Sequence, residues 1–373
     1  MTFIAGARPN ARTVEELLAG GVASSKRRGT VTPEELQTRV QDTVDERIDS
    51  GTELGVRVAV IHGGRLAVNV ASGLADVSGR VVQPNTLFWA ASTAKGVAST
   101  VAHVLAELGI LDYDMPLAAV WPEFAQHGKD TVTVRHVLCH TAGVPPAASR
   151  FDAGRALRLG ADVHRPGRGA AVVGTGYSLR LPRSYLWLSA GETLRRLTGR
   201  SISTLLRELI TAPLGVVDEV HFGVPDRLLP SVAQQVAHAG SVPNPPEPGS
   251  AQAGALPAAV APTADLVNRP DILRADIPST GTMTAGGATR MYAALLGLVD
   301  ETALVAPDRL RTIADVVYTG ADMVMAFPPS GPSGTAPIVP PPRPPEGARP
   351  SAWSAPTDRL PSLTSSLALR SPS

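Results

Sequence analysis

The sequence predicts a globular protein of mixed α and β structure. Three observations support this fold class: an amphipathic helix pattern is followed at once by a β-hairpin pattern, a long proline-free helix pattern comes next, and further helix patterns lie in the second half of the chain. Apolar residues make up 43% of the 373 residues, which is enough for a substantial buried core. The length fits one large domain or two ordinary ones.

A helix and a hairpin are predicted to open the fold. Thr32 is a typical N-cap, Pro33 suits the first helical position, and acidic residues follow in the first turn. Two β-prone runs, 56–61 and 65–71, are separated by His62-Gly63-Gly64, whose glycines allow the positive φ of a tight turn. The helix is expected to end near Gly51, because up to there apolar residues recur every four positions: Leu36, Val40, Val44 and Ile48.

Three further stretches predict helices. Residues 192–214 predict one or two helices, interrupted at Gly199 and stopped by Pro213 and Gly215. Residues 288–298 predict another. Residues 92–111 contain no proline and predict a long buried helix that begins at Ser92, with one apolar face made of Val97, Val101, Val104, Leu105 and Leu108.

Composition argues against several classes of protein. Lys plus Arg (34) nearly equals Asp plus Glu (33), so no basic field is available to hold nucleic acid or an anionic membrane. The single cysteine, Cys139, cannot form an internal disulfide, and we expect it to be a buried thiol without a catalytic role. No signal-peptide pattern and no run of 18 apolar residues is found, so we expect a cytoplasmic protein without a membrane span.

Ser92 and Lys95 are the candidate catalytic residues. On a helix that begins at Ser92, residues three apart share a face, so the Lys95 side chain passes within hydrogen-bond reach of the Ser92 hydroxyl. Lysine acts as the base for a serine only if burial or nearby positive charge lowers the lysine pKa. The positive end of the helix dipole favours the neutral amine, and the Ser92 N–H can face a developing oxyanion. The alternative is that Ser92 is an N-cap and Lys95 a solvated residue.

Three segments resemble the β-lactamase-related serine hydrolases, the family that includes class C β-lactamases, DD-peptidases and similar esterases. They are Thr86 to Gly96 (TLFWAASTAKG), Leu108 to Asp112 (LGILD) and Val132 to Gly143 (VTVRHVLCHTAG), which are similar to the family's nucleophile helix and its HTxG turn. Weaker similarity returns at 191–215, 222–225 and 268–297. Within the family, the chain is most similar to the esterase branch that resembles actinobacterial lipases.

The resemblance implies a fold, a reaction and a set of roles. The family fold is an antiparallel sheet flanked by helices beside a helical subregion, with the active site between them. The family reaction is hydrolysis through an acyl-enzyme, here on Ser92 with Lys95 as general base. His136 and His140 match the HTxG segment and are expected to be structural, and the resemblance implies no metal or cofactor.

Two other motifs of the family are not found in register. One is a tyrosine of a Y-x-N or Y-H-A motif that relays protons, and the other is an H/K-x-G motif on an edge strand that completes the oxyanion hole. Tyr177 and Tyr185 lie in about the right stretch but lack the surrounding motif, so an ordinary aromatic role is the main expectation for both.

The two stretches in which these motifs are missing suggest that parts of the chain are translated out of frame. Residues 146–184 show neither helix nor strand periodicity, and prolines crowd together after Phe327. Permitted codons for Arg158 to Trp187, read one nucleotide later, can encode a W-x-P-G-T turn and a Y-H-A motif. We therefore expect an N-terminal extension over 1–30, a β-lactamase-related domain over 31–327 with out-of-frame translation near 146–188, and a disordered, proline-rich, out-of-frame tail over 328–373.

The sequence thus predicts a serine hydrolase that cleaves a small ester or amide. An ester is favoured over a β-lactam, because the esterase-like segments dominate the resemblance. Two alternatives stay open: a catalytically impaired remnant that lacks the tyrosine and the third motif, and a non-catalytic protein that binds ligands in the cleft.

Overall fold

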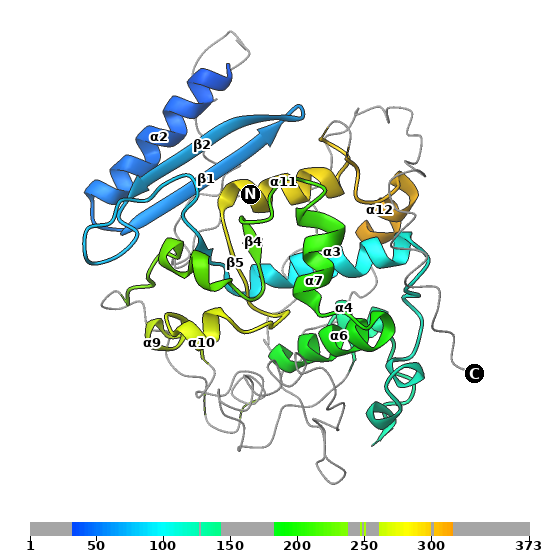
Figure 1. Cartoon of the computed structure of the whole chain (residues 1–373). Helices are drawn as coiled ribbons and strands as arrows, with labels where there is room; N and C mark the ends of the chain where they lie inside the picture. Colours follow the sequence, from blue (N-terminus) through cyan, green and yellow to red (C-terminus); the bar gives the residue numbers. More distant parts are fainter. Residues whose placement is uncertain are drawn as a thin grey trace.

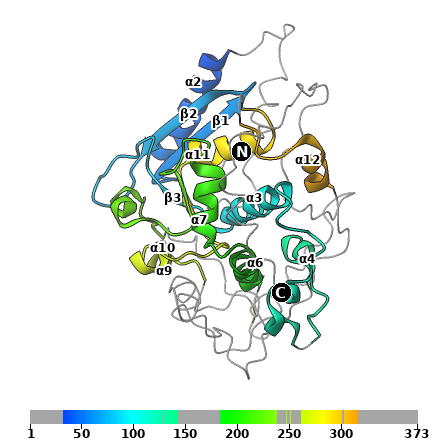
Figure 2. The ribbon, with the colours of Figure 1, turned by 45° about the vertical axis from the view of Figure 1, so that its right-hand side comes forward.

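The computed structural model describes residues 32–126, 128–142, 183–237, 247, 250, 261–299 and 302–315. Helix α3 runs through the middle of the molecule, with α11 on one side of it and α4 and α6 on the other (Figures 1 and 2). The elements in chain order are α2 (Pro33–Asp49), β1 (Gly55–His62), β2 (Arg65–Gly73), β3 (Phe88–Trp89), α3 (Ala94–Glu107), α4 (Val134–Leu138), α6 (Arg183–Thr198), α7 (Ile202–Leu206), β4 (Val220–His221), α9 (Ala264–Val267), α10 (Pro270–Leu273), β5 (Thr282–Met283), α11 (Ala285–Leu295) and α12 (Pro307–Ala314).

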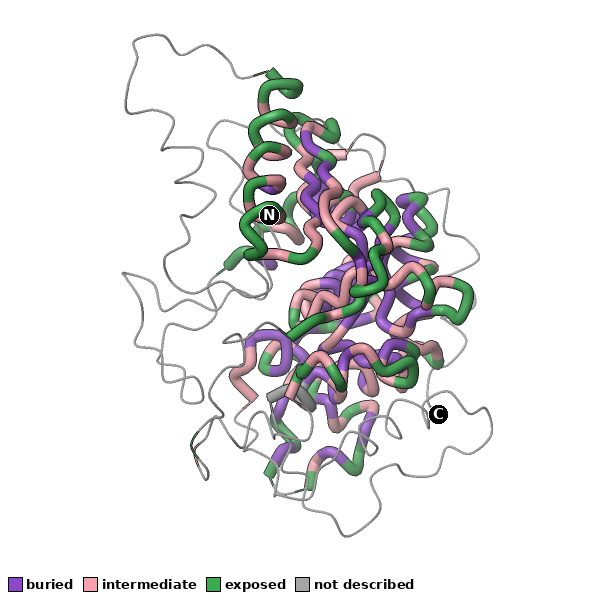
Figure 3. The backbone as a smooth tube through the Cα atoms, turned by 90° about the vertical axis from the view of Figure 1, so that its left-hand side faces the viewer, coloured by how far each residue is buried: buried purple, intermediate pink, exposed green. Residues whose placement is uncertain are grey.

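Helix α2 begins where the sequence predicts. The Thr32 hydroxyl accepts a hydrogen bond from the Glu35 N–H at 3.2 Å, and the Thr32 N–H donates to the Glu35 carboxylate at 3.0 Å. This reciprocal capping box satisfies two N–H groups at the helix start. The helix ends at Asp49, and Gly51 follows at φ 69°. Its outer face is exposed (Figure 3), as expected for an amphipathic helix that packs on one side only.

The predicted hairpin is confirmed. Strands β1 and β2 pair antiparallel, and Gly63 and Gly64 in the turn have φ 55° and 78°. Helix α2 covers one face of the hairpin and α11 contacts β1 from the other side (Figure 1). The Thr289 hydroxyl of α11 donates to the Ala59 carbonyl at 3.2 Å. The core of this layer is made of Val44, Val58, Val68 and Val70.

A second, smaller antiparallel sheet has the strand order β3-β5-β4. Met283 of the central strand pairs with Phe88 on one side and Val220 on the other. Each of these strands is only two residues long, too short to give an alternating pattern in the sequence. The expected combination of antiparallel sheets and helices is therefore present, but the residue pattern of the sequence did not predict the small β3-β5-β4 sheet.

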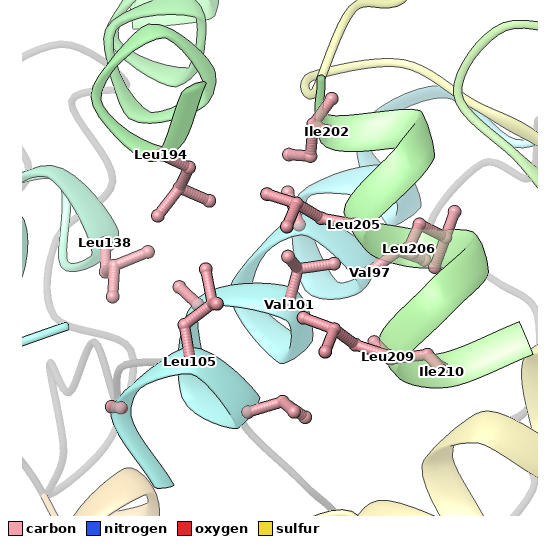
Figure 4. Packing of buried hydrophobic residues seen from close by; sticks show 14 of the residues in the cluster. Val97, Val101, Leu105, Leu138, Leu194, Ile202, Leu205, Leu206, Leu209 and Ile210 are labelled. Carbon is pink, nitrogen blue, oxygen red and sulfur yellow. The ribbon is translucent and has the colours of Figure 1, made fainter. Parts of the chain in front are cut away.

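The main core surrounds α3. The predicted apolar face of this helix is buried, with Val97, Val101 and Leu105 each at most 1% exposed. The predicted start at Ser92 was wrong: α3 begins at Ala94, because the positive φ of Ala91 places Ser92 in a separate 3-10 turn, Ala91–Thr93. The helix ends at Glu107, four residues before the predicted end, and Gly109 follows at φ 70°. Figure 4 shows how α3 meets the side chains of the helical region, among them Leu138, Leu194, Ile202, Leu205, Leu206, Leu209 and Ile210.

The other predicted helices are present with shifted boundaries. Gly199, at φ 72°, separates α6 from α7 as expected, and a π-helical turn, Arg207–Thr211, continues α7. Helix α6 already begins at Arg183, before the predicted start. Helix α11 begins at Ala285, three residues early, because the Thr284 hydroxyl caps it by accepting from the Gly287 N–H at 2.9 Å.

Within the described residues, no helix has the length and apolar character needed to cross a membrane. The predicted N-terminal extension, the proline-rich tail and residues 146–182 of the out-of-frame segment lie outside the described residues.

Candidate active site

Ser92 and Lys95 are in direct contact. Ser92 lies in a 3-10 turn, Ala91–Thr93, that leads straight into α3, and Lys95 lies in the first turn of that helix. The Lys95 Nζ donates a hydrogen bond to the Ser92 Oγ at 2.6 Å. Ser92 is exposed and Lys95 is half-buried, so the hydroxyl is accessible from solvent. The contact predicted from the three-residue spacing is therefore present.

The backbone before Ser92 has an unusual conformation. Ala91 has φ 46°, in the left-handed region that non-glycine residues rarely adopt. This turn joins β3 to α3, and Ser92 within it is exposed. Such a conformation persists only where its surroundings fix it. Here the Ala90 N–H donates to the Gly281 carbonyl at 2.7 Å, and the Thr93 N–H donates to the Ala90 carbonyl at 3.0 Å.

Gly281, just before β5, lies against the start of the nucleophile helix. A Cβ atom at this position would stand 2.9 Å from the Ala94 Cβ and 2.8 Å from the His221 carbonyl oxygen. Both distances are too short for a real side chain, so only glycine fits between α3 and β4. The small sheet therefore contacts the Ser92 turn closely through Gly281.

Tyr292 of α11 packs against the first turn of α3 at Gly96. A Cβ at Gly96 would stand only 2.0 Å from the Tyr292 hydroxyl, so the tyrosine packs directly on the Gly96 backbone. Burial raises the pKa of Tyr292 to about 12, and the phenol therefore stays protonated at neutral pH. The sequence patterns did not indicate either Tyr292 or Gly281, because their importance depends on contacts with residues far away in the chain.

The two histidines of the HTxG segment have structural contacts, as expected. The His136 Nδ1 accepts from the Thr133 N–H at 3.1 Å and completes the cap of α4. His140 has φ 59°, and its Nε2 accepts from the Trp187 Nε1 at 2.9 Å, which ties this turn to α6. Cys139 is buried, and burial raises its pKa to about 11, so its thiol stays protonated at neutral pH.

Other parts expected of the site fall outside the described residues. These are Tyr177, the side chain of Tyr185 and the segment expected to hold the third motif. Among the residues that the structure describes, no group of three or more His, Cys, Asp or Glu side chains is placed to hold a metal ion.

Comparison with known proteins identifies the family. The family model described as Beta-lactamase matches residues 40–327, which is most of the chain. The chain belongs to the beta-lactamase family. This family contains serine hydrolases, both esterases and β-lactamases, and the family expected from the nucleophile segment is therefore confirmed.

Named relatives and solved structures agree with this assignment. The esterase/β-lactamase LipL of Mycobacterium tuberculosis is 30% identical over 272 residues, which cover 65% of this chain and 58% of that protein. The chain thus spans little more than half the length of this relative. A penicillin-binding protein homologue from Caulobacter crescentus has a TM-score of 0.64 at 31% identity, covering 77% of both chains. A family VIII carboxylesterase has a TM-score of 0.63 at 27% identity, covering 78% of both chains.

Proposed function

We propose that this member of the beta-lactamase family hydrolyses small esters through an acyl-enzyme on Ser92, with Lys95 as general base. The single observation that carries the proposal is the 2.6 Å contact between Lys95 Nζ and Ser92 Oγ. Covalent hydrolysis requires a nucleophile and a base whose side chains lie within hydrogen-bond distance of each other, as these two do.

The geometry supports a simple sequence of steps. In the acylating form the neutral Lys95 amine takes the proton of the Ser92 hydroxyl, and Oγ attacks the carbonyl carbon of the ester. The tetrahedral intermediate collapses when the proton passes to the leaving alcohol, and Ser92 remains acylated. Water then attacks the acyl carbon while Lys95 takes a proton from the water, the bond between the acyl carbon and Ser92 Oγ breaks, and Lys95 returns the proton to Oγ as the acid is released. The Ser92 N–H, in the turn just before α3, is the proposed first donor to the oxyanion.

An ester is the proposed substrate class because of the relatives' names. LipL is named an esterase/β-lactamase, the Burkholderia gladioli relative EstB is named an esterase, and the solved structure at 27% identity is a carboxylesterase. The exposed Ser92 hydroxyl also suits a small, diffusible ester. The cytoplasmic location and the lack of a nucleic-acid partner stay predictions from the sequence.

Hydrolysis of p-nitrophenyl butyrate by the full chain tests the proposal. Ser92→Ala should abolish turnover and labelling by a fluorophosphonate, and Lys95→Ala should lower the acylation rate by about 100-fold or more, the usual size of a general-base effect. Ser72→Ala, which removes a serine hydroxyl from β2, is the control and should retain the wild-type rate. Equal rates for the wild type and Ser92→Ala would refute the proposal and favour the non-catalytic readings.

The out-of-frame segments remain a proposal as well, and the coding DNA tests it. If the codons of Val172 to Tyr185, read one base later, do not spell W-E-P-G-T followed by Y-H-A, the reading-frame hypothesis fails. If they do, the chain as translated lacks the family's tyrosine motif. The impaired-remnant reading would then predict turnover far below that of an ester hydrolase with a complete site.

A further inference from the structure

The Ser92 turn is held from one side by residues 276–281, here named the strap. At its end, the Gly281 carbonyl accepts from the Ala90 N–H at 2.7 Å, and Gly281 is wedged between Ala94 and the His221 carbonyl. Every residue of the strap except Thr280 is buried. The strap therefore contacts the left-handed turn before Ser92 directly, through a hydrogen bond and close packing.

The other end of the strap is fixed to α7. Asp276 is 8% exposed, and its Oδ1 accepts from the Ser203 hydroxyl at 2.6 Å while its Oδ2 lies 3.5 Å from the Ser203 N–H. Ser203 lies in the first turn of α7. Between the two ends, Pro278 packs against α6 so closely that a Cβ at Gly191 would stand 3.0 Å from it.

Helix α7 itself packs on the nucleophile helix. Leu205 of α7 lies with Val97 and Val101 of α3 in one buried cluster (Figure 4). The hydrogen bond between Ser203 and Asp276 therefore closes a ring of contacts that runs from α3 through α7 and the strap back to the start of α3. This bond links the buried Asp276 at the start of the strap directly to α7.

We propose that Asp276 and Ser203 are positioning residues for Ser92, an inference that rests on the proposed function. Their proposed effect on Ser92 is indirect. Their hydrogen bond sets the position of the strap, and the strap holds the Ala90 N–H and Ala94 on either side of the Ala91 turn. An unusual backbone conformation at a reacting residue depends on such support, and small displacements of a nucleophile reduce rates strongly.

The chain offers a matched control for this bond. The Ser72 hydroxyl of β2 donates to Asp45 Oδ1 of α2 at 2.6 Å, the same pair of groups at the same distance and also partly buried. This second pair joins α2 to the hairpin, whose main helix contacts are with α2 and α11. Ser203→Ala and Ser72→Ala thus each remove a serine hydroxyl that donates to a carboxylate at 2.6 Å, and the first of these two bonds belongs to the ring of contacts around α3.

Hydrogen exchange of the full chain tests the positioning role without reference to activity. The Ala90 amide donates to Gly281, so its exchange reports directly on the strap. Ser203→Ala should speed exchange in a peptide covering 89–95 by about tenfold, the effect expected from the loss of one buried hydrogen bond. Ser72→Ala should leave this peptide unchanged. Equal exchange of this peptide in both variants and the wild type would overturn the inference.

Acylation kinetics complete the test. At a temperature below both unfolding transitions, Ser203→Ala should lower kcat for p-nitrophenyl butyrate and the fluorophosphonate labelling rate by about tenfold or more, with little change in KM. Ser203→Thr, which keeps the hydroxyl, should restore both. If Ser203→Ala does not fold, Asp276→Asn replaces it and should show the same direction of change. A wild type that is not labelled would refute the proposed function, whereas a labelled wild type with unchanged Ser203→Ala would refute the positioning role.

Discussion

Acidification should destabilise this protein through His103, a histidine buried in the middle of α3. Its side chain is fully buried, and its Nδ1 lies 2.8 Å from the Tyr113 hydroxyl. Burial, assisted by the nearby Arg309, lowers the pKa of His103 from its ordinary 6.5 to about 3. The folded protein therefore keeps this imidazole neutral in mild acid, where the unfolded chain binds a proton.

The sign and size of the effect follow from this difference. Above pH 6.5 both states carry a neutral His103, and its contribution to stability is fully present. Between pH 6.5 and about 3 the unfolded state binds one proton more, so the free energy of unfolding falls as pH falls. The slope for one such group is about 1.4 kcal/mol per pH unit, which gives about 2 kcal/mol between pH 6.5 and about pH 5.

Urea unfolding at several pH values between about 7 and 5 measures this slope. His103→Leu removes the titrating group, so its stability should fall with acid less steeply than that of the wild type, by about 1.4 kcal/mol per pH unit. Tyr113→Phe is the control: it removes the hydrogen bond but leaves His103 buried, so it should keep the steep wild-type slope. Parallel curves for the wild type and His103→Leu would refute the reasoning.

Three further substitutions test the packing and capping described above. Gly96→Ala should lower the free energy of unfolding by about 1–3 kcal/mol, because the new Cβ would stand 2.0 Å from the Tyr292 hydroxyl. This loss should outweigh the better helix propensity of alanine. In urea titrations, adding Tyr292→Phe to Gly96→Ala should recover most of the lost stability. Thr32→Ala should cost about 1 kcal/mol by removing the acceptor of the Glu35 N–H, and unchanged urea midpoints would contradict this. Leu205→Ala, at a site 1% exposed, should cost about 2–5 kcal/mol, with a loss below about 1 kcal/mol arguing against the packing of α7 on α3.

Features that depend on neighbouring residues could be predicted from the sequence. The capping box of Thr32 and Glu35, the glycine turn at 63–64 and the contact between Ser92 and Lys95 each involve groups no more than three residues apart. Local backbone geometry decides such contacts almost completely. The apolar face of α3 was predictable for the same reason, because burial of one helix face leaves a regular spacing in the sequence.

Boundaries were less predictable where a cap or a tertiary contact competed with the pattern. The apolar spacing of α3 continues to Leu108, but the helix ends at Glu107 because the chain reverses at Gly109. Helix α11 starts early because Thr284 caps it, and the same hydroxyl also donates to the Glu219 carboxylate at 2.6 Å. The second of these contacts joins residues 65 positions apart, which no window of local sequence contains.

The sequence by itself thus determined the family, the hairpin, and the helix start at which Ser92 and Lys95 come into contact. Only the tertiary structure decided what surrounds that helix: Gly281 against Ala94, and Tyr292 against Gly96. The physical reason is that periodicity and capping record the local environment of each residue, whereas close packing between elements depends on how the whole chain folds. The nucleophile was visible in the sequence, and the support that fixes its turn became visible only in three dimensions.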